Sequence, residues 1–498
     1  MNSTVRELVE RQAAQRPHAI YAIDADGQRS ITFAELARAC RQVGALLRSV
    51  GSRPGDTVSV VMPNGLQTLR VLLGAMHGGW CVNPINLLSA PNQMRYVLGH
   101  SDSRVVVVSP EWEQPVRAML TGLGREVALL VSDAGIGDLP VEEGLTEPPA
   151  PDALALLMYT SGTTGRPKGV MLTQANLAAN ALAISAEHGL GPDDRVLAVL
   201  PLYHINAFAV TMLAPLAHGG SLAMPPKFSA ARFWAQASER QCTWINVVPT
   251  MISYLLEGAA PPREQTARIR FCRSASAALP SEHLRAFEQK FGIGIIETMG
   301  LTETVAPAFS NPLDASQRKL GAVGRASGCE ARVIDANLAP VPDGQTGEIA
   351  IRGSNVMRGY YKNEEATRAA FTPDGWLRSG DLGHRDSDGF FFVTGRIKEL
   401  IIKGGENIAP REIDEALLRH PAVQEAAAVG IPDRHYGQEI MACIVLREGM
   451  ACSEDELRKF CLEQLGRYKT PKVFRFVAAL PRGPSGKVQR LKLLDTLI

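Results

Sequence analysis

The sequence predicts an α/β fold in which a large layered N-terminal domain of α/β sheets, plus a β subdomain, precedes a small α+β C-terminal domain. Three observations predict this arrangement. Helical and strand patterns alternate in the first part, short strands with turns follow from residue 324, and the last hundred residues carry a separate pattern. With 45% apolar residues in 498, the chain can bury large cores.

The first half of the chain alternates between helices and strands. Residues 33–47 place apolar side chains at helical spacing, and residues 56–62 and 154–160 are short apolar runs suited to buried strands. Residues 196–226 hold no Asp, Glu, Lys or Arg, but prolines and glycines interrupt them. We therefore expect a buried sheet region that lines a pocket there, rather than a membrane span.

The second half predicts two smaller units. Turns such as Pro-Asp-Gly at 342–344 separate short strands over residues 324–352, which indicates a β subdomain. Further on we expect a helix at about 412–420, strands at 425–431 and 440–446, and a second helix from a Ser453/Glu456 capping box to residue 465. The charged segment 395–398 separates two apolar runs, so we place the domains at 1–396 and 397–498.

Composition excludes several classes of protein. The 52 Lys and Arg nearly balance the 51 Asp and Glu, which argues against nucleic acid or an anionic membrane as the main partner. The eight cysteines are scattered without metal-ligand spacing, so we expect buried, reduced thiols. The N-terminal residues form a charged amphipathic pattern and not a signal peptide. We expect a cytoplasmic protein with no stable membrane insertion.

Residues 159–169 read Tyr-Thr-Ser-Gly-Thr-Thr-Gly-Arg-Pro-Lys-Gly, directly after a predicted strand. Glycines let backbone amides turn toward an anion, while hydroxyls and a lysine add donors and charge. In the Walker pattern a glycine comes directly before the lysine. This loop differs, because Lys168 comes directly before Gly169. It predicts a phosphate-binding site made by Thr160, Ser161, Gly162, Thr163, Thr164, Gly165 and Lys168.

This loop resembles the signature of the adenylate-forming superfamily, which comprises acyl-CoA synthetases, adenylation domains and luciferases. Further segments resemble the motifs of that family in the same order along the chain: PLYH at 201–204, MGLTE at 299–303, GEIAIRG at 347–353, WLRSGD at 376–381, GRIK at 395–398, GGENI at 404–408 and LPRGPSGK at 480–487. The resemblance is strongest to bacterial AMP-forming acyl-CoA synthetases.

The resemblance implies an ATP-dependent ligase with Mg²⁺ and coenzyme A. A carboxylic acid and ATP would give an acyl-adenylate and pyrophosphate, and the CoA thiol would then give acyl-CoA and AMP. The implied catalytic residues are Thr302 at the α-phosphate, Glu303 at Mg²⁺, His204, and Lys487 between the attacking carboxylate and the α-phosphate. A carboxylate suits Mg²⁺, which keeps several waters and few protein ligands.

The resemblance also implies the nucleotide contacts and a mobile C-terminal domain. Asp381 and Arg396 would hold the ribose, and the adenine site would include Ser276, Ala277, Glu297, Thr298 and Met299. Met299 stands where the family usually has a stacking tyrosine. Lys398 occupies the hinge position, and rotation there would bring Gly404 and Gly405 to the pantetheine arm of CoA.

Motif positions place seven residues in the acyl pocket: His204, Ala207, Phe208, Val247, Gly300, Leu301 and Val305. Most are apolar, and the absence of an acidic residue near His204 argues against an amino acid as substrate. We expect a small or medium aliphatic monocarboxylic acid, hydroxylated forms included. Arg273 keeps malonate-like acids open, with a carnitine-like acid as an outlier.

Other interpretations of the same motifs stay open. The main alternative is a free-standing adenylation enzyme that loads an acyl group onto a carrier protein. Nothing supports a luciferase-like oxidation, and a non-catalytic relative would be expected to lack Glu303, Asp381 or Lys487. The sequence leaves a homodimer open. It also leaves open an acetyltransferase and deacetylase acting on Lys487, since the segment resembles acetylated sites in bacterial acyl-CoA synthetases.

Overall fold

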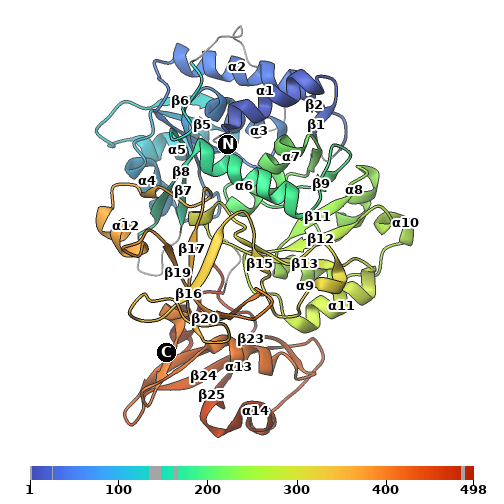
Figure 1. The fold of residues 1–498 in the computed structure, drawn as a ribbon, viewed down its shortest axis with the longest axis vertical. Coiled ribbons are helices and arrows are strands. Elements are labelled where there is room, and N and C mark those ends of the chain that lie inside the picture. Colours follow the sequence, from blue (N-terminus) through green and yellow to red (C-terminus); the bar gives the residue numbers. More distant parts are fainter. Residues whose placement is uncertain (1–2, 25, 134–146, 161–165, 484–487, 498) are drawn as a thin grey trace.

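The computed structural model describes residues 3–24, 26–133, 147–160, 166–483 and 488–497. The molecule is elongated, with residues up to about 320 at one end and the last hundred residues at the other (Figure 1). None of the helices in the described ranges is long and apolar enough to cross a membrane.

A seven-stranded sheet carries the predicted phosphate loop. In spatial order its strands are β18 (Gly359–Tyr360), β8 (Lys168–Thr173), β7 (Leu154–Thr160), β4 (Cys81–Pro84), β3 (Thr57–Val61), β5 (Val105–Val108) and β6 (Ala128–Val131). Strands β7, β4, β3, β5 and β6 are parallel, whereas β8 and β18 are antiparallel additions at one edge. The predicted strands at 56–62 and 154–160 are confirmed as β3 and β7.

A nine-stranded sheet lies beside the first one. Its order is β15 (Arg325–Ala326), β14 (Phe309–Ser310), β13 (Ile295–Met299), β12 (Phe271–Ser274), β11 (Trp244–Val247), β9 (Arg195–Leu197), β10 (Ser221–Met224), β1 (Ile20–Asp24) and β2 (Ser30–Thr32). The run from β13 to β1 is parallel. Parallel strands bring their carboxyl ends to one edge, where α/β proteins bind ligands.

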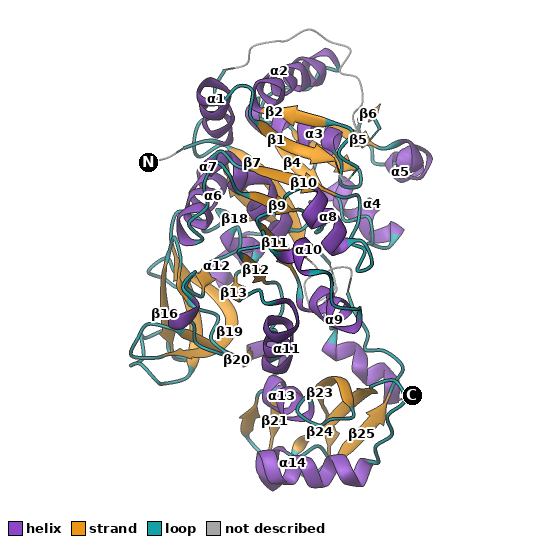
Figure 2. Cartoon of the chain, turned by 90° about the vertical axis from the view of Figure 1, so that its right-hand side faces the viewer, coloured by secondary structure: helices purple, strands orange, loops and turns teal. Residues whose placement is uncertain are grey.

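The helices of this part pack around the two sheets (Figure 2). Most of their apolar faces enter one large core that both sheets share, which buries side chains from β1, β3, β4, β7, β9 and β12 among others, whereas α4 and α5 pack in a second, smaller core. The helices are α1 (Val5–Gln15), α2 (Phe33–Ser49), α3 (Leu66–His77), α4 (Pro91–His100), α5 (Glu113–Leu120), α6 (Gln174–Glu187), α7 (Ala214–His218), α8 (Phe233–Glu239), α9 (Pro249–Glu257), α10 (Arg263–Thr266), α11 (Ser281–Phe291) and α12 (Glu364–Ala370).

The predicted β subdomain is an antiparallel four-stranded sheet. Its order is β16 (Glu330–Ile334), β17 (Gly347–Arg352), β19 (Leu377–Arg385) and β20 (Phe391–Arg396). Strand β20 ends where a short 3₁₀ helix, Ile397–Glu399, begins. The sheet therefore leads directly into the segment that the family resemblance predicts to be a hinge.

The C-terminal residues build their own sheet and cores (Figure 2). Strands β21 (Ile401–Lys403), β22 (Glu406–Ile408), β23 (Val423–Asp433), β24 (Gly437–Leu446) and β25 (Val473–Phe476) pack against α13 (Pro410–Leu417) and α14 (Glu454–Lys469). The predicted capping box is present, because the Ser453 side chain accepts from the Glu456 amide. The 396/397 boundary stays a prediction.

Two sequence expectations need correction. Residues 196–226 are not sheet throughout: strands β9 and β10 flank a π-helix, Ala207–Leu213, and α7. The composition suits either state, because a fully buried helix is as apolar as a buried strand. The C-terminal pattern also missed β21 and β22, since three-residue strands carry too little periodicity. All eight cysteines are free, and Cys329 and Cys452 are only partly buried.

Candidate active site

The predicted phosphate loop lies between two paired strands. Thr160 at the end of β7 is opposite Lys168 at the start of β8, so the strand pair holds both ends of the loop together. The predicted residues Ser161, Gly162, Thr163, Thr164 and Gly165 lie outside the described residues.

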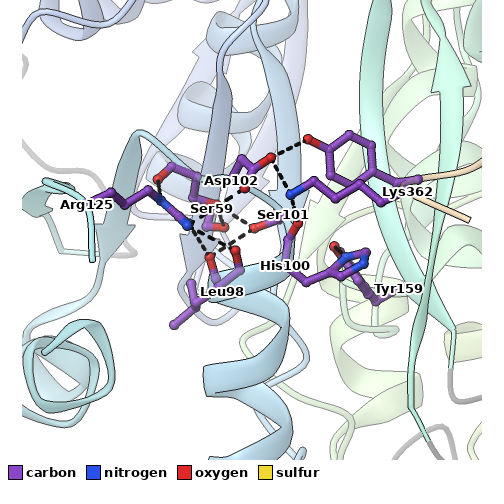
Figure 3. A network of polar contacts seen from close by, with 11 residues as sticks. Ser59, Leu98, His100, Ser101, Asp102, Arg125, Tyr159 and Lys362 are labelled. Atoms are coloured by element: carbon purple, nitrogen blue, oxygen red, sulfur yellow. Dashed lines mark hydrogen bonds and ion pairs between the residues drawn. The ribbon is translucent and has the colours of Figure 1, made fainter. Parts of the chain in front are cut away.

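A polar network fixes β7 just before this loop (Figure 3). The Nδ1 atom of His100, at the end of α4, lies 2.7 Å from the Tyr159 hydroxyl. Asp102 forms an ion pair with Lys362 at 2.6 Å and accepts a hydrogen bond from the Tyr361 hydroxyl at 2.8 Å. The network ties α4 and the chain after β18 to the base of the loop. Sequence reasoning missed it, because its members are spread along the chain from His100 to Lys362.

Glu303, the predicted Mg²⁺ ligand, connects to Lys168 through Tyr360. The Tyr360 hydroxyl donates to Glu303 Oε1 at 2.8 Å, and Lys168 Nζ lies 4.9 Å from the centre of the Tyr360 ring. Burial, together with Glu303, raises the pKa of Tyr360 well above its ordinary value, so the hydroxyl keeps its proton. Thr302 and Glu303 share a 3₁₀ turn. Sequence reasoning missed Tyr360 because no motif covered it.

The donor set near Glu303 fits Mg²⁺. The described residues contain no group of three or more His, Cys, Asp or Glu side chains that could hold a metal ion. One carboxylate with an oxygen not used by Tyr360 is the protein contribution expected for an ion that keeps several waters and binds substrate phosphates. Glu303 would hold Mg²⁺, which would neutralise charge on the phosphates.

Asp381 and Arg396, both predicted at the ribose, form a paired unit. They are opposite each other on β19 and β20, and Arg396 donates to Asp381 from Nε at 2.6 Å and from Nη2 at 3.3 Å. Asp381 is 4% exposed, whereas the Arg396 side chain is 43% exposed. The carboxylate therefore has a fixed orientation, because a bidentate guanidinium contact restricts its plane.

A cleft of about 380 Å³ runs between the large part and the last hundred residues. Asp381 and Arg396 line it, together with the predicted adenine-site residues Ser276, Ala277, Glu297, Thr298 and Met299, and with Gly300. Burial raises the pKa of Glu297 to about 7, against the opposing effect of Arg411. The cleft thus brings together residues from three separate sequence motifs, at 299–303, 376–381 and 395–398.

Gly300 occupies a position that requires glycine. A Cβ there would lie 2.8 Å from Pro307 Cα and 2.9 Å from Ala306 Cα, which are backbone atoms that cannot move aside. The close approach packs the turn after β13 against residues 306 and 307.

Most predicted acyl-pocket residues are not among those that line this cleft. Ala207, Phe208, Val247 and Val305 are fully buried, and His204 and Leu301 are partly buried. His204 packs edge-on against Tyr203, with ring centres 4.8 Å apart. Ala207 and Phe208 lie in the π-helix, an irregularity that is frequent at functional sites. Of the predicted pocket residues, Gly300 lines the cleft, and the others lie behind its wall.

The predicted CoA-facing glycines lie within the C-terminal sheet. Gly404 and Gly405 join β21 to β22 with φ of 55° and 86°, the left-handed region that favours glycine. Gly404, Gly405 and Lys398 do not line the cleft. Glu399, which follows Lys398, does line it. Lys487 lies outside the described residues. Chain on both sides of it lines the cleft, namely Leu480, Arg482, Val488 and Arg490.

Comparisons with known proteins identify the class. The AMP-binding enzyme family matches residues 9–361, and the C-terminal domain of AMP-binding enzymes matches residues 412–487. The chain therefore belongs to the AMP-binding enzyme family, within the adenylate-forming superfamily.

Several CoA ligases are similar to this chain over nearly its whole length. A sulfoacetate–CoA ligase of Cupriavidus necator is 58% identical over 498 residues, which cover 99% of this chain and 97% of that protein. An oxalate–CoA ligase of Arabidopsis thaliana is 34% identical, and the match covers 98% of this chain and 98% of that protein. The crystal structure of ATP-bound MatB from Rhodopseudomonas palustris matches with a TM-score of 0.93 at 32% identity, covering 99% of this chain and 98% of that one. The chain is an AMP-forming CoA ligase that uses ATP and CoA, with the Mg²⁺ typical of its family.

Proposed function

We propose that the enzyme joins CoA to a short carboxylic acid that carries a second anionic group, with sulfoacetate as the first candidate. The observation that carries this proposal is the 58% identity to a sulfoacetate–CoA ligase, which extends over nearly all of both chains. The oxalate–CoA ligase relative also acts on a short acid with two anionic ends.

These relatives argue against a simple aliphatic monocarboxylate, the substrate that the sequence suggested. That expectation followed from the apolar residues near His204. They also argue against loading of a carrier protein, because the relatives are named as CoA ligases. A homodimer and acetylation of Lys487 stay predictions.

In the first half-reaction, one oxygen of the substrate carboxylate attacks the α-phosphorus of ATP. A P–O bond forms, the bond to pyrophosphate breaks, and an acyl-adenylate results. The phosphate loop and Lys168 would hold the β- and γ-phosphates, Thr302 would donate to the α-phosphate, and Lys487 would offset charge between the two reacting groups. Asp381 would accept from the ribose hydroxyls while Arg396 holds its carboxylate in place.

In the second half-reaction, the CoA sulfur attacks the acyl carbon: a C–S bond forms, the C–O bond to AMP breaks, and the thiol proton is released to solvent. Gly404 and Gly405 form an exposed turn between β21 and β22 that does not line the cleft, so they would approach the acyl carbon only if this part rotates about Lys398. Glycines without side chains would leave room for the pantetheine arm.

The test measures AMP and pyrophosphate release with a panel of acids, with and without CoA. The panel contains sulfoacetate, oxalate, malonate, acetate and butyrate. We expect CoA-dependent AMP release to be greatest with sulfoacetate or another acid that has two anionic ends. Greater activity with acetate or butyrate, or AMP release that needs a carrier protein in place of CoA, would refute the proposal.

A further inference from the structure

Arg273 is a fully buried arginine whose guanidinium is only partly satisfied. It lies on β12 with 0% of its surface exposed. Its Nη1 donates to Asn206 Oδ1 at 2.6 Å and to Asn246 Oδ1 at 2.8 Å. Its Nε and Nη2 atoms, also shielded from solvent, have no hydrogen-bond partner among the described residues.

The two unpartnered nitrogens share one edge of the guanidinium plane. Their N–H groups point in parallel, which is the geometry that binds a carboxylate, phosphate or sulfonate through two hydrogen bonds. The protein thus uses the Nη1 end of Arg273 and leaves its bidentate edge open.

The charge of Arg273 lacks an acidic counterpart in the part of the chain that the structure describes, where none of the ion pairs includes it. The nearby His188 is also buried, and burial together with Arg273 lowers the pKa of His188 to about 3, so that ring is neutral. Burial likewise lowers the pKa of Arg273. An unpaired buried charge is costly, and proteins normally pair it.

The guanidinium lies next to the predicted acyl pocket. Asn206, which accepts from Arg273, follows His204 by two residues, and its Nδ2 donates to Ser276 Oγ at 3.3 Å. Ser276 lines the cleft and has a φ of 76°, a conformation that a non-glycine residue rarely adopts. The path from the cleft wall to Arg273 therefore passes through two polar side chains, Ser276 and Asn206.

We propose that the open edge of Arg273 binds the distal anionic group of the substrate, the sulfonate in sulfoacetate, and so determines specificity for acids with two anionic ends. This inference rests on the proposed function. Asn206 and Asn246 hold the guanidinium in orientation, and the substrate supplies the counter-charge that the protein omits.

The test compares two substrates that differ in one charge. Methylsulfonylacetate replaces one sulfonate oxygen of sulfoacetate by a methyl group, so it keeps the shape and loses the distal charge. ATP–pyrophosphate exchange is measured with both acids for the wild type, Arg273→Met and Arg273→Lys. Arg195→Met is the matched control, because Arg195 lies on β9 of the same sheet and its guanidinium donates to Ser221 and to the Arg240 carbonyl.

We expect Arg273→Met to lower kcat/KM for sulfoacetate on the order of a hundredfold, since two hydrogen bonds to a charged group are lost. The kcat/KM for methylsulfonylacetate should stay nearly unchanged, and Arg273→Lys should restore part of the activity with sulfoacetate. Arg195→Met should preserve the wild-type ratio of kcat/KM for sulfoacetate to kcat/KM for methylsulfonylacetate. An equal loss with both acids, or an unchanged preference in Arg273→Met, would overturn the inference.

Two further measurements separate the possible failures. Asn206→Asp is nearly isosteric and places a carboxylate beside Nη1, so it should fold and yet lose sulfoacetate selectively; an unchanged preference there would also overturn the inference. A wild type that activates neither sulfoacetate nor oxalate nor malonate would refute the proposed function, and the role of Arg273 with it. A wild type that activates sulfoacetate while Arg273→Met does so equally well would refute the role of Arg273 alone.

Discussion

The hydroxyl of Tyr360 provides a sharp test of how Glu303 is positioned. Tyr360→Phe removes one oxygen and keeps the ring over which Lys168 Nζ lies at 4.9 Å. Glu303 then loses the hydrogen bond that it accepts from Tyr360 at 2.8 Å. Because burial raises the pKa of Tyr360, the wild-type hydroxyl donates over the whole working pH range.

The size of the effect follows from the kind of bond lost. A hydrogen bond to a charged group contributes about 1.5–3 kcal/mol. Tyr360 is only half-buried, so we use the lower half of that range, which corresponds to about a 13- to 45-fold change in rate. We expect ATP–pyrophosphate exchange to fall by that factor and the Mg²⁺ concentration at half-maximal rate to rise.

Tyr361→Phe is the matched control for this measurement. It removes the same atom from the next residue, whose hydroxyl donates to Asp102 at 2.8 Å. Asp102 keeps its ion pair with Lys362, so we expect a change of less than about twofold in exchange. An unchanged rate and Mg²⁺ dependence in Tyr360→Phe, or an equal loss in both variants, would refute the positioning of Glu303 by Tyr360.

Three further predictions concern the catalytic lysine, the hinge and a titrating carboxyl. Lys487→Ala should lower ATP–pyrophosphate exchange on the order of a thousandfold, because the lost charge pair is worth about 4 kcal/mol. Thioester formation from supplied acyl-adenylate should persist, and unimpaired exchange would contradict the prediction. Lys398→Pro fixes φ and should reduce thioester formation far more than adenylation; equal losses would count against a hinge. Glu297 has a pKa raised to about 7 from 4.5, so it binds more protons when folded and its contribution to stability falls as pH rises through that window. Glu297→Gln should remove about 3 kcal/mol of this dependence in denaturant titrations at several pH values, whereas parallel curves for variant and wild type would exclude it.

Local signals in the sequence predicted much of the fold. Strand β7 begins and ends where its apolar run does, and the Ser453/Glu456 box marks the start of α14, because both depend on neighbouring residues alone. The motifs also predicted that Asp381 and Arg396 meet, and they face each other across β19 and β20. The roles of these residues in catalysis stay predictions.

Other features depend on tertiary packing that no local pattern encodes. The π-helix Ala207–Leu213 is apolar on all sides because it is wholly buried, so its composition could not distinguish it from a strand. Tyr360 meets Glu303 only because β18 adds to the edge of the phosphate-loop sheet. Around Arg273, residues distant in the sequence come together: His188 at the end of α6 stacks on Phe271 of β12, and Asn206, just before the π-helix, accepts from Arg273.

The separation of the hydrophobic cores has a consequence for the conformational equilibrium. Among the described residues, no apolar cluster combines side chains from before and after residue 397. Contacts across that division include polar ones, such as Gln424 to Glu257 at 3.1 Å and Arg411 to the Val393 carbonyl at 2.8 Å. Polar contacts of this kind exchange readily with water, so reorientation of the last hundred residues exposes little apolar surface. If the last hundred residues rotate about the predicted hinge at Lys398, ligand occupancy and ionic strength would set the population of each orientation, while the apolar clusters on either side of residue 397 stay intact.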